Sequence, residues 1–71
     1  MTVTELIAHL RCFDGDHRVV VRGYEEGVDD ILPPRGVEIV LDVHDEDWNG
    51  PHDMVESAGE PAILIAGVRP R

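Results

Sequence analysis

Four histidines and fifteen carboxylates are the residues of this 71-residue chain that could do chemistry. The nearest approach to a metal-binding cluster is His44-Asp45 together with His52-Asp53. Their spacing matches no zinc pattern, and the calcium-loop pattern of alternating acidic residues with a central glycine and a terminal glutamate is absent. We therefore expect exposed histidines in a solvated loop. The alternative is a metal-dependent enzyme that uses His44, His52 and the neighbouring carboxylates.

Nucleophiles and phosphate-binding loops are scarce in this sequence. Ser57 is the only serine, it lies in no nucleophile-elbow motif, and no glycine-rich phosphate loop is present. A general acid or base needs a shifted pKa inside a concave pocket, and a domain of this size has little room for one. The single cysteine, Cys12, excludes an internal disulfide and a four-cysteine zinc site. We predict that the protein is not an enzyme and needs no cofactor and no metal.

Charge is the most unusual feature of the composition. Fifteen acidic residues face six basic ones, all arginine, and the formal net charge is −9. Segment 36–68 has eight carboxylates and neither lysine nor arginine. Nucleic-acid binding requires cationic side chains that replace counterions, and anionic lipid also repels an acidic protein. We therefore expect a basic protein surface as the partner, without direct binding to nucleic acid or membrane.

Length and apolar content limit the size and location of the fold. At 71 residues the chain fits one small domain over 1–71, which buries only about 60% of its unfolded surface. No apolar run approaches the ~20 residues that span a bilayer, and no basic flank precedes an apolar segment at the N-terminus. We expect a cytoplasmic protein that is a monomer or a weak dimer.

Apolar periodicity predicts one helix near the N-terminus. Residues 1–13 carry apolar side chains at steps of three and four residues. Thr2 followed by Glu5 fits a capping box, in which each side chain accepts a hydrogen bond from the other residue's backbone N–H. The helix is expected to pack its apolar side on a sheet.

Three further segments have the pattern of strands. The clearest alternation is at 37–44, a short β-branched run lies at 18–22, and a third run lies at 62–68. Segment 62–68 is apolar on both faces, which favours a central strand. The turn-rich segment 23–36 is predicted to be a connection. The expected fold is α+β, with one N-terminal helix packed on a mainly antiparallel three-stranded sheet.

The remaining chemistry is recognition of a protein through carboxylates. Carboxylates two residues apart along a strand are separated by about 6.8 Å, close to twice the ~3.4 Å rise per nucleotide of one DNA strand. An acidic strand or loop can thus present charges at a phosphate-like pitch. Charge and loop position select one set of partner-binding candidates: Glu25, Glu26, Asp29, Asp30, Asp45, Glu46, Asp47 and Trp48.

Two aromatic rings lie beside these acids. Trp48 directly follows Asp47, and Tyr24 directly precedes Glu25. An aromatic ring inside a charged rim is typical of an interface anchor. The alternative is a ring that folds back over the small core. The sequence leaves both interpretations open for Trp48 and favours core cover for Tyr24.

A resemblance to other small proteins lies in two segments: Met-Thr-Val-Thr-Glu-Leu-Ile at 1–7, and Arg-Val-Val-Val-Arg-Gly-Tyr-Glu-Glu-Gly-Val-Asp-Asp-Ile at 18–31. They resemble a group of short proteins from bacteria, phages and mobile elements, well over 1–45 and loosely beyond. The chain is also similar to small type I-C anti-CRISPR proteins. This resemblance implies a stoichiometric inhibitor whose acidic surface occupies the basic, DNA-binding channel of a CRISPR surveillance complex. It supplies no list of site residues.

A second hypothesis is a generic acidic protein-interaction or regulatory module of a mobile element, also without catalysis. Such a module could dimerise through an exposed sheet edge, or through an uncovered sheet face that carries Val20 and Val40.

Overall fold

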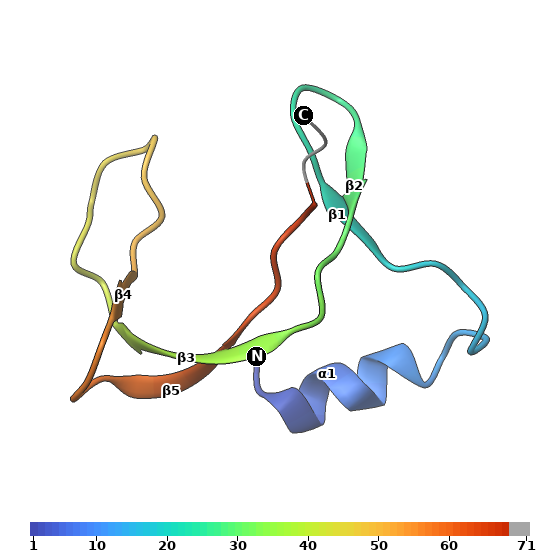
Figure 1. Cartoon of the computed structure of the whole chain (residues 1–71), viewed down its shortest axis with the longest axis horizontal. Coiled ribbons are helices and arrows are strands. Elements are labelled where there is room, and N and C mark those ends of the chain that lie inside the picture. Colours follow the sequence, from blue (N-terminus) through green and yellow to red (C-terminus); the bar gives the residue numbers. More distant parts are fainter. Residues whose placement is uncertain (69–71) are drawn as a thin grey trace. The chain divides into compact units, whose positions relative to one another are not determined.

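The described part of the chain, residues 1–68 of the computed structural model, has one helix and five short strands (Figure 1). Its contacts divide it into two compact units. Unit 1 comprises Met1–Leu32 and the segment that begins at Ala66, and unit 2 comprises Pro33–Ile65. The single helix and the antiparallel strands confirm the α+β class. The expectation of one domain over 1–71 stays a prediction.

Unit 1 begins with helix α1 (Val3–Leu10), which is shorter than the predicted 1–13. Its start is the predicted capping box. The Thr2 N–H donates to Glu5 Oε1 at 2.7 Å, and the Glu5 N–H donates to Thr2 Oγ1 at 3.1 Å. These two bonds satisfy two of the amides that a helix N-terminus leaves without a partner inside the helix. After the cap at Arg11, the chain continues as a turn.

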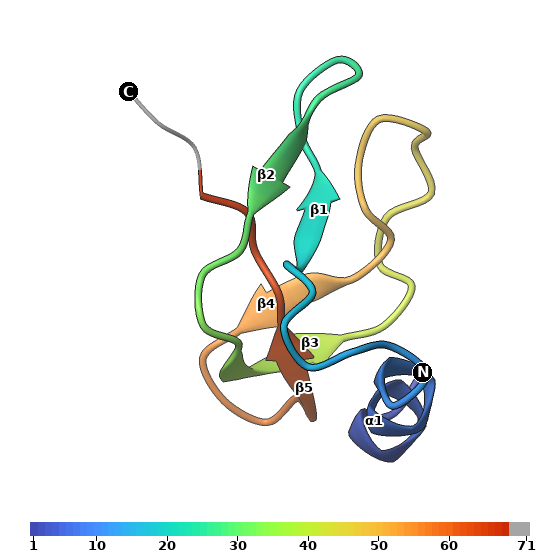
Figure 2. The same cartoon turned by 90° about the vertical axis from the view of Figure 1, so that its right-hand side faces the viewer.

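The second part of unit 1 is a hairpin of β1 (Val20–Arg22) and β2 (Val28–Asp30) (Figure 2). Its turn is closed by a hydrogen bond of 2.9 Å from the Gly23 N–H to the Gly27 carbonyl oxygen. The segment from Ala66 returns along the end of β2, where the Leu32 N–H donates to the Ala66 carbonyl oxygen at 2.9 Å. The predicted connection 23–36 is therefore wrong. It contains β2, whose three residues are too few to show a period.

Unit 2 is a three-stranded antiparallel sheet in the order β4-β3-β5. Its strands are β3 (Arg35–Val40), β4 (Asp53–Val55) and β5 (Glu60–Leu64). In the centre, Ile39 is paired with Met54 on one side and with Glu60 on the other. The prediction that 62–68 is the central strand is wrong: β3 is central and β5 lies at an edge.

The link from β4 to β5 crosses β3 closely. A Cβ atom on Gly59 would lie 2.8 Å from the Ile39 carbonyl oxygen, so only glycine fits without a shift. The Gly59 N–H donates to Glu38 Oε1 at 2.9 Å, which ties the link to the central strand. Ala58, just before it, has a positive φ of 66°.

Among residues 1–68, neither unit has a buried core. Each of these residues is exposed or half-buried, and the half-buried ones in unit 2 are concentrated in Val37–Val40 of β3 and at Val55, Ala62 and Leu64 of the two neighbouring strands. The helix belongs to unit 1 and the three-stranded sheet to unit 2, so the packing of one on the other stays a prediction. In the described part of the chain, no helix has the length and apolar character needed to cross a bilayer.

Candidate acidic interaction surface

The eight predicted partner-binding residues fall into two groups, one on each unit. The hairpin acids are Glu25, Glu26, Asp29 and Asp30 of unit 1, and the loop acids are Asp45, Glu46 and Asp47 of unit 2, with Trp48 beside them. The structure thus brings four acids together on the β1–β2 hairpin and three in the loop between β3 and β4. Each group is a separate candidate surface.

The turn of the hairpin presents its two glutamates to solvent. Glu25 and Glu26 are exposed, and Glu25 has a positive φ of 55°. Residues other than glycine, asparagine and aspartate rarely adopt this conformation, which costs about 1–2 kcal/mol. The turn therefore holds a carboxylate at a position where glycine would be more stable.

The two aspartates of β2 point to opposite faces. Asp30 is exposed and pairs with Arg18, with 3.5 Å between Arg18 Nη1 and Asp30 Oδ1. Asp29 is half-buried, and its Oδ2 would lie 2.9 Å from a Cβ atom on Gly23. Successive side chains of a strand alternate in direction, so these two carboxylates cannot form one row. The hairpin presents Asp30 on the outer face and keeps Asp29 close to the turn.

The loop acids are carried by a loop whose neck is fixed by hydrogen bonds. The N–H groups of Val43 and His44 both donate to the Pro51 carbonyl oxygen, at 2.7 and 3.1 Å. The Asp42 N–H donates to His52 Nδ1 at 3.1 Å. These bonds hold the two ends of the loop together. Its acidic tip, from Asp45 to Asp47, is exposed.

Both candidate aromatic rings are exposed. The exposed fraction is 86% for Trp48 and 74% for Tyr24. Neither ring covers a core in its own unit. The interpretation that the ring folds back over a core is therefore wrong for Tyr24, and it is also wrong for Trp48. Trp48 follows the loop acids directly, which places a large apolar surface next to three carboxylates.

Of the two loop histidines, His52 is exposed, as expected, and His44 is half-buried. His44 is half-buried between two carboxylates, with 3.3 Å from its Nε2 to Asp53 Oδ2 and 3.9 Å from its Nδ1 to Glu46 Oε1. His52 Nδ1 accepts the Asp42 N–H, which leaves Nε2 as the ring nitrogen that could bind a metal. Within residues 1–68, His44 and His52 do not join one group of metal-binding geometry.

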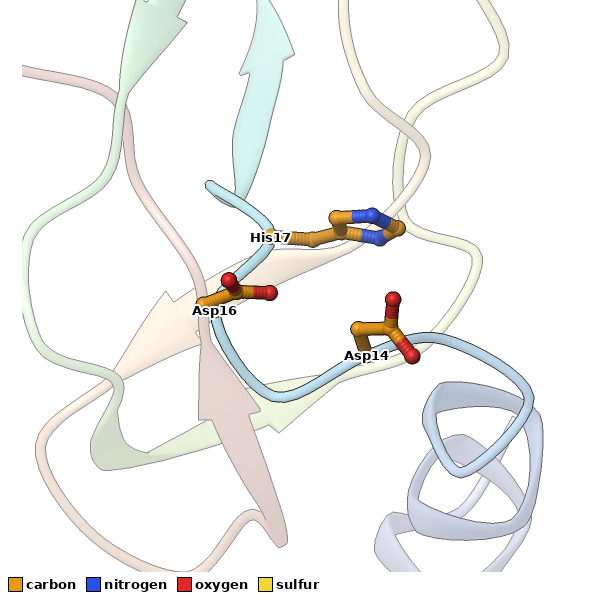
Figure 3. A group of neighbouring side chains, drawn as sticks. All are labelled: Asp14, Asp16 and His17. Carbon is orange, nitrogen blue, oxygen red and sulfur yellow. The ribbon is translucent and has the colours of Figure 1, made fainter.

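The structure does place three other potential ligands together, in the turn between α1 and β1. One ligand atom from each of Asp14, Asp16 and His17 lies within 4.8 Å of the others (Figure 3). All three residues are exposed, and the His17 ring lies 6.2 Å from the Phe13 ring, centroid to centroid. The signal in the sequence is the short spacing Asp-x-Asp-His, which is common in exposed turns. Three exposed groups in one turn do not define a metal site.

Shallow apolar grooves are found in both units. The groove of unit 1, about 740 Å³, lies where the end of the helix meets the start of the hairpin and is lined mainly by Leu10, Phe13, Val19 and Val20. The groove of unit 2, about 540 Å³, follows β3 and β5. Neither groove is lined by any of the partner-binding candidates.

Comparisons with protein families, with characterised proteins and with solved structures give no match for this chain.

Proposed function

We propose that the protein is a non-enzymatic inhibitor that binds a basic, DNA-binding protein surface through its carboxylates. In its most specific form, the proposal is that the hairpin acids and the loop acids occupy the DNA-binding channel of a type I CRISPR surveillance complex. The protein would then act as a mimic of DNA phosphates and exclude target DNA at the step that reads the protospacer-adjacent motif.

The observation that carries the proposal is the lack of internal neutralisation. Glu25 and Glu26 of the hairpin, and Asp45 and Asp47 of the loop, are exposed. In the described part of the chain, none of these four forms an ion pair with an arginine. Their charge is available to a partner at little desolvation cost, because they lie in turns and not in a packed interior.

Self-repulsion gives a second argument. A net charge of −9 on 71 residues destabilises a compact chain, and the described part of neither unit has a buried core to offset that cost. A net charge of about 2–8 in magnitude is enough to keep a small domain soluble, so the charge of this chain lies just above that range. The same carboxylates that repel one another attract the cations of a basic partner. Association steered by charge in this way is fast and sensitive to salt.

The ring of Trp48 gives the loop acids an apolar neighbour. A cation that pairs with these carboxylates can also lie over an exposed indole face, which contributes about 0.5–1 kcal/mol at an exposed site. Mimicry of phosphates requires carboxylates and does not require an exposed tryptophan. The proposal therefore assigns Trp48 as the anchor of the loop acids on an arginine-rich surface.

A competition experiment tests the proposal directly. Purified type I-C surveillance complex is incubated with a labelled target duplex, and the protein is added at rising concentration in physiological salt. Loss of duplex binding at nearly stoichiometric protein is the expected result. Unchanged duplex binding and unchanged cleavage would contradict the anti-CRISPR proposal. The generic acidic interaction module would then be the remaining hypothesis.

Three variants separate local charge from total charge in this assay. Asp45→Asn/Glu46→Gln/Asp47→Asn removes the loop acids, and we expect it to weaken inhibition by at least about tenfold. The control Asp16→Asn/Glu56→Gln/Glu60→Gln removes the same number of exposed charges elsewhere and is expected to inhibit like the wild type. Glu25→Gln/Glu26→Gln tests the hairpin acids in the same way. Equal losses from the loop variant and the control would show that only total charge matters.

A further inference from the structure

We propose that β5 forms a homodimer by pairing its outer edge with β5 of a second copy of the chain. The two three-stranded sheets would then join into one six-stranded sheet with the two β5 strands at its centre. This proposal concerns a surface of unit 2 that the proposed function does not use. The dimer can therefore be tested independently of the proposed function.

The first argument is a conflict between the composition of β5 and its position. Residues 61–68 contain no charged side chain and are apolar on both faces, a composition typical of the inside of a sheet, whereas edge strands usually carry charged residues. Among the described strands, β5 lies at an edge of its sheet (Figure 1) and is paired only with β3. Ile63 and Ile65 are exposed, by 49% and 39%. A second β5 supplies the missing neighbour.

The unpaired backbone of β5 gives the second argument. One side of the strand pairs with β3, from Arg35↔Leu64 to Ile39↔Glu60. In the described residues, no backbone hydrogen bond reaches its other side. A free edge without lysine or a bulge is a template for another strand. Pro61 lies at the start of β5, so it blocks one position and leaves Ala62 to Leu64 able to pair.

The charges on the free edges identify β5 as the edge that suits a second copy. Self-pairing of β1 about Val20 would place Arg18 opposite Arg22 of the copy, and like charges directly opposite each other destabilise a sheet. The edge strand β4 has only three residues, of which Asp53 is acidic. Antiparallel pairing of β5 about Ile63 places Ile63 opposite Ile63 of the copy, brings apolar residues together and keeps the two Glu60 carboxylates at opposite ends.

The same charges argue against a basic partner on this edge. The part of β5 after Glu60 carries no charge, so it offers a basic surface no ion pair to compensate for the desolvation of its cations. Between two copies that each carry −9, an uncharged seam is the place of contact with the least repulsion. The expected dimer is therefore weak at low salt and tighter at moderate salt. Binding to a basic partner has the opposite dependence on salt.

Sedimentation over a range of protein concentrations, at low and at moderate salt, tests the proposal. We expect the wild-type mass to rise from monomer to dimer with concentration, and the dissociation constant to fall as salt rises. Ile63→Lys should weaken the dimer by at least about tenfold, because a lysine on each copy meets at the seam. Met54→Lys makes the same charge change at an exposed position of the opposite edge, and its dimer should match the wild type.

Hydrogen exchange on the wild-type chain provides a test without substitutions, in case Ile63→Lys fails to fold. Amide protection in β5 should increase with protein concentration, while protection in β4 stays constant. A monomer at every concentration and salt would overturn the proposal, as would a dimer that Ile63→Lys and Met54→Lys affect equally. Inhibition of duplex binding by the Ile63→Lys variant reports on the proposed function separately.

Discussion

The carboxylate of Glu38 accepts a hydrogen bond of 2.9 Å from the backbone N–H of Gly59, a residue 21 positions further along the chain. Glu38 is in the middle of the central strand β3, where it is opposite Val55 of β4 and Pro61 of β5. One acidic side chain thus connects the central strand to the link that joins the two edge strands. The acid here is structural, unlike those proposed to bind a partner.

Removing this acceptor should destabilise unit 2. Glu38→Ala leaves the Gly59 N–H without its partner in a half-buried position, and we expect a loss of about 1–2 kcal/mol in the free energy of unfolding. Glu38→Gln keeps a carbonyl acceptor and should lose less than half of that. Urea unfolding followed by far-UV circular dichroism measures both. Equal stability of the alanine and glutamine variants would mean that the hydrogen bond contributes nothing.

Adding a methyl group to Gly59 should be costly. Its Cβ atom would lie 2.7 Å from Val55 Cγ2 and 2.8 Å from the Ile39 carbonyl oxygen, and the backbone cannot easily move away. We expect Gly59→Ala to lower the free energy of unfolding by about 1–3 kcal/mol. Gly36→Ala is the matched control, because nothing lies within 4 Å of its Cβ position and its φ is not positive. That variant should be neutral or slightly more stable.

Local signals in the sequence predicted the parts of the fold that depend on neighbours along the chain. The capping box of Thr2 and Glu5 is seen as predicted, because it needs only two residues three positions apart. The alternation of 37–44 identified β3, although the strand ends at Val40. Beyond it, Asp42 has a φ of 56°, which turns the chain out of the sheet.

The order of the strands could not be read from these signals. Segment 62–68 has the composition of a central strand, but composition does not specify which strands supply its hydrogen-bond neighbours. The three-residue strands β2 and β4 are shorter than the windows in which a period can be recognised. Their pairing depends on contacts between residues far apart in the sequence.

The sequence predicted the charged residues of the candidate site better than the directions and contacts of their side chains. Glu25, Glu26 and the loop acids are exposed, as loop position suggested. Asp29 differs because a strand places it on the inner face, and that strand was not recognised. The role of His44 depends on Asp53, nine positions away across the loop, and no local pattern indicates such a contact.

Replacing Glu25 should separate stability from binding. Glu25→Gly removes the strain of a positive φ and should raise the free energy of unfolding by up to about 1 kcal/mol, while it removes one proposed contact charge. Glu26→Gly removes the same charge at a residue without positive φ and should lower stability by about 0.5–1 kcal/mol. Both variants should inhibit less well. Stabilities that change in the same direction would show that the turn is not strained at Glu25.

The capping box should make α1 sensitive to acid. The Thr2 backbone N–H, and secondly the Thr2 hydroxyl, hold the pKa of Glu5 below its ordinary value of 4.5. A lowered pKa in the folded state stabilises the helix above pH 4.5, and this stabilisation is lost as the pH falls through the lower, folded value. NMR titration of the Glu5 carboxyl should show this. In Thr2→Val the pKa should rise only part of the way, because the backbone N–H remains; an unchanged pKa would contradict the role of the hydroxyl.

Salt should stabilise the isolated protein. Between about 0.01 and 0.15 M salt, the Debye length falls from about 30 Å to about 8 Å, which screens repulsion among the carboxylates. Salt also weakens attraction between opposite charges, but this loss is small. The Arg18–Asp30 pair is highly exposed, and pairs of this kind contribute only about 0–1 kcal/mol. We therefore expect the melting temperature to rise by several degrees over this range.

If the repulsion is a property of the whole chain, the triple variant of the loop acids and the equally charged control Asp16→Asn/Glu56→Gln/Glu60→Gln should show the same smaller rise. A larger reduction in the loop variant would place the repulsion within the loop itself, and a melting temperature that falls with salt would mean that the carboxylates are already stabilised by local partners.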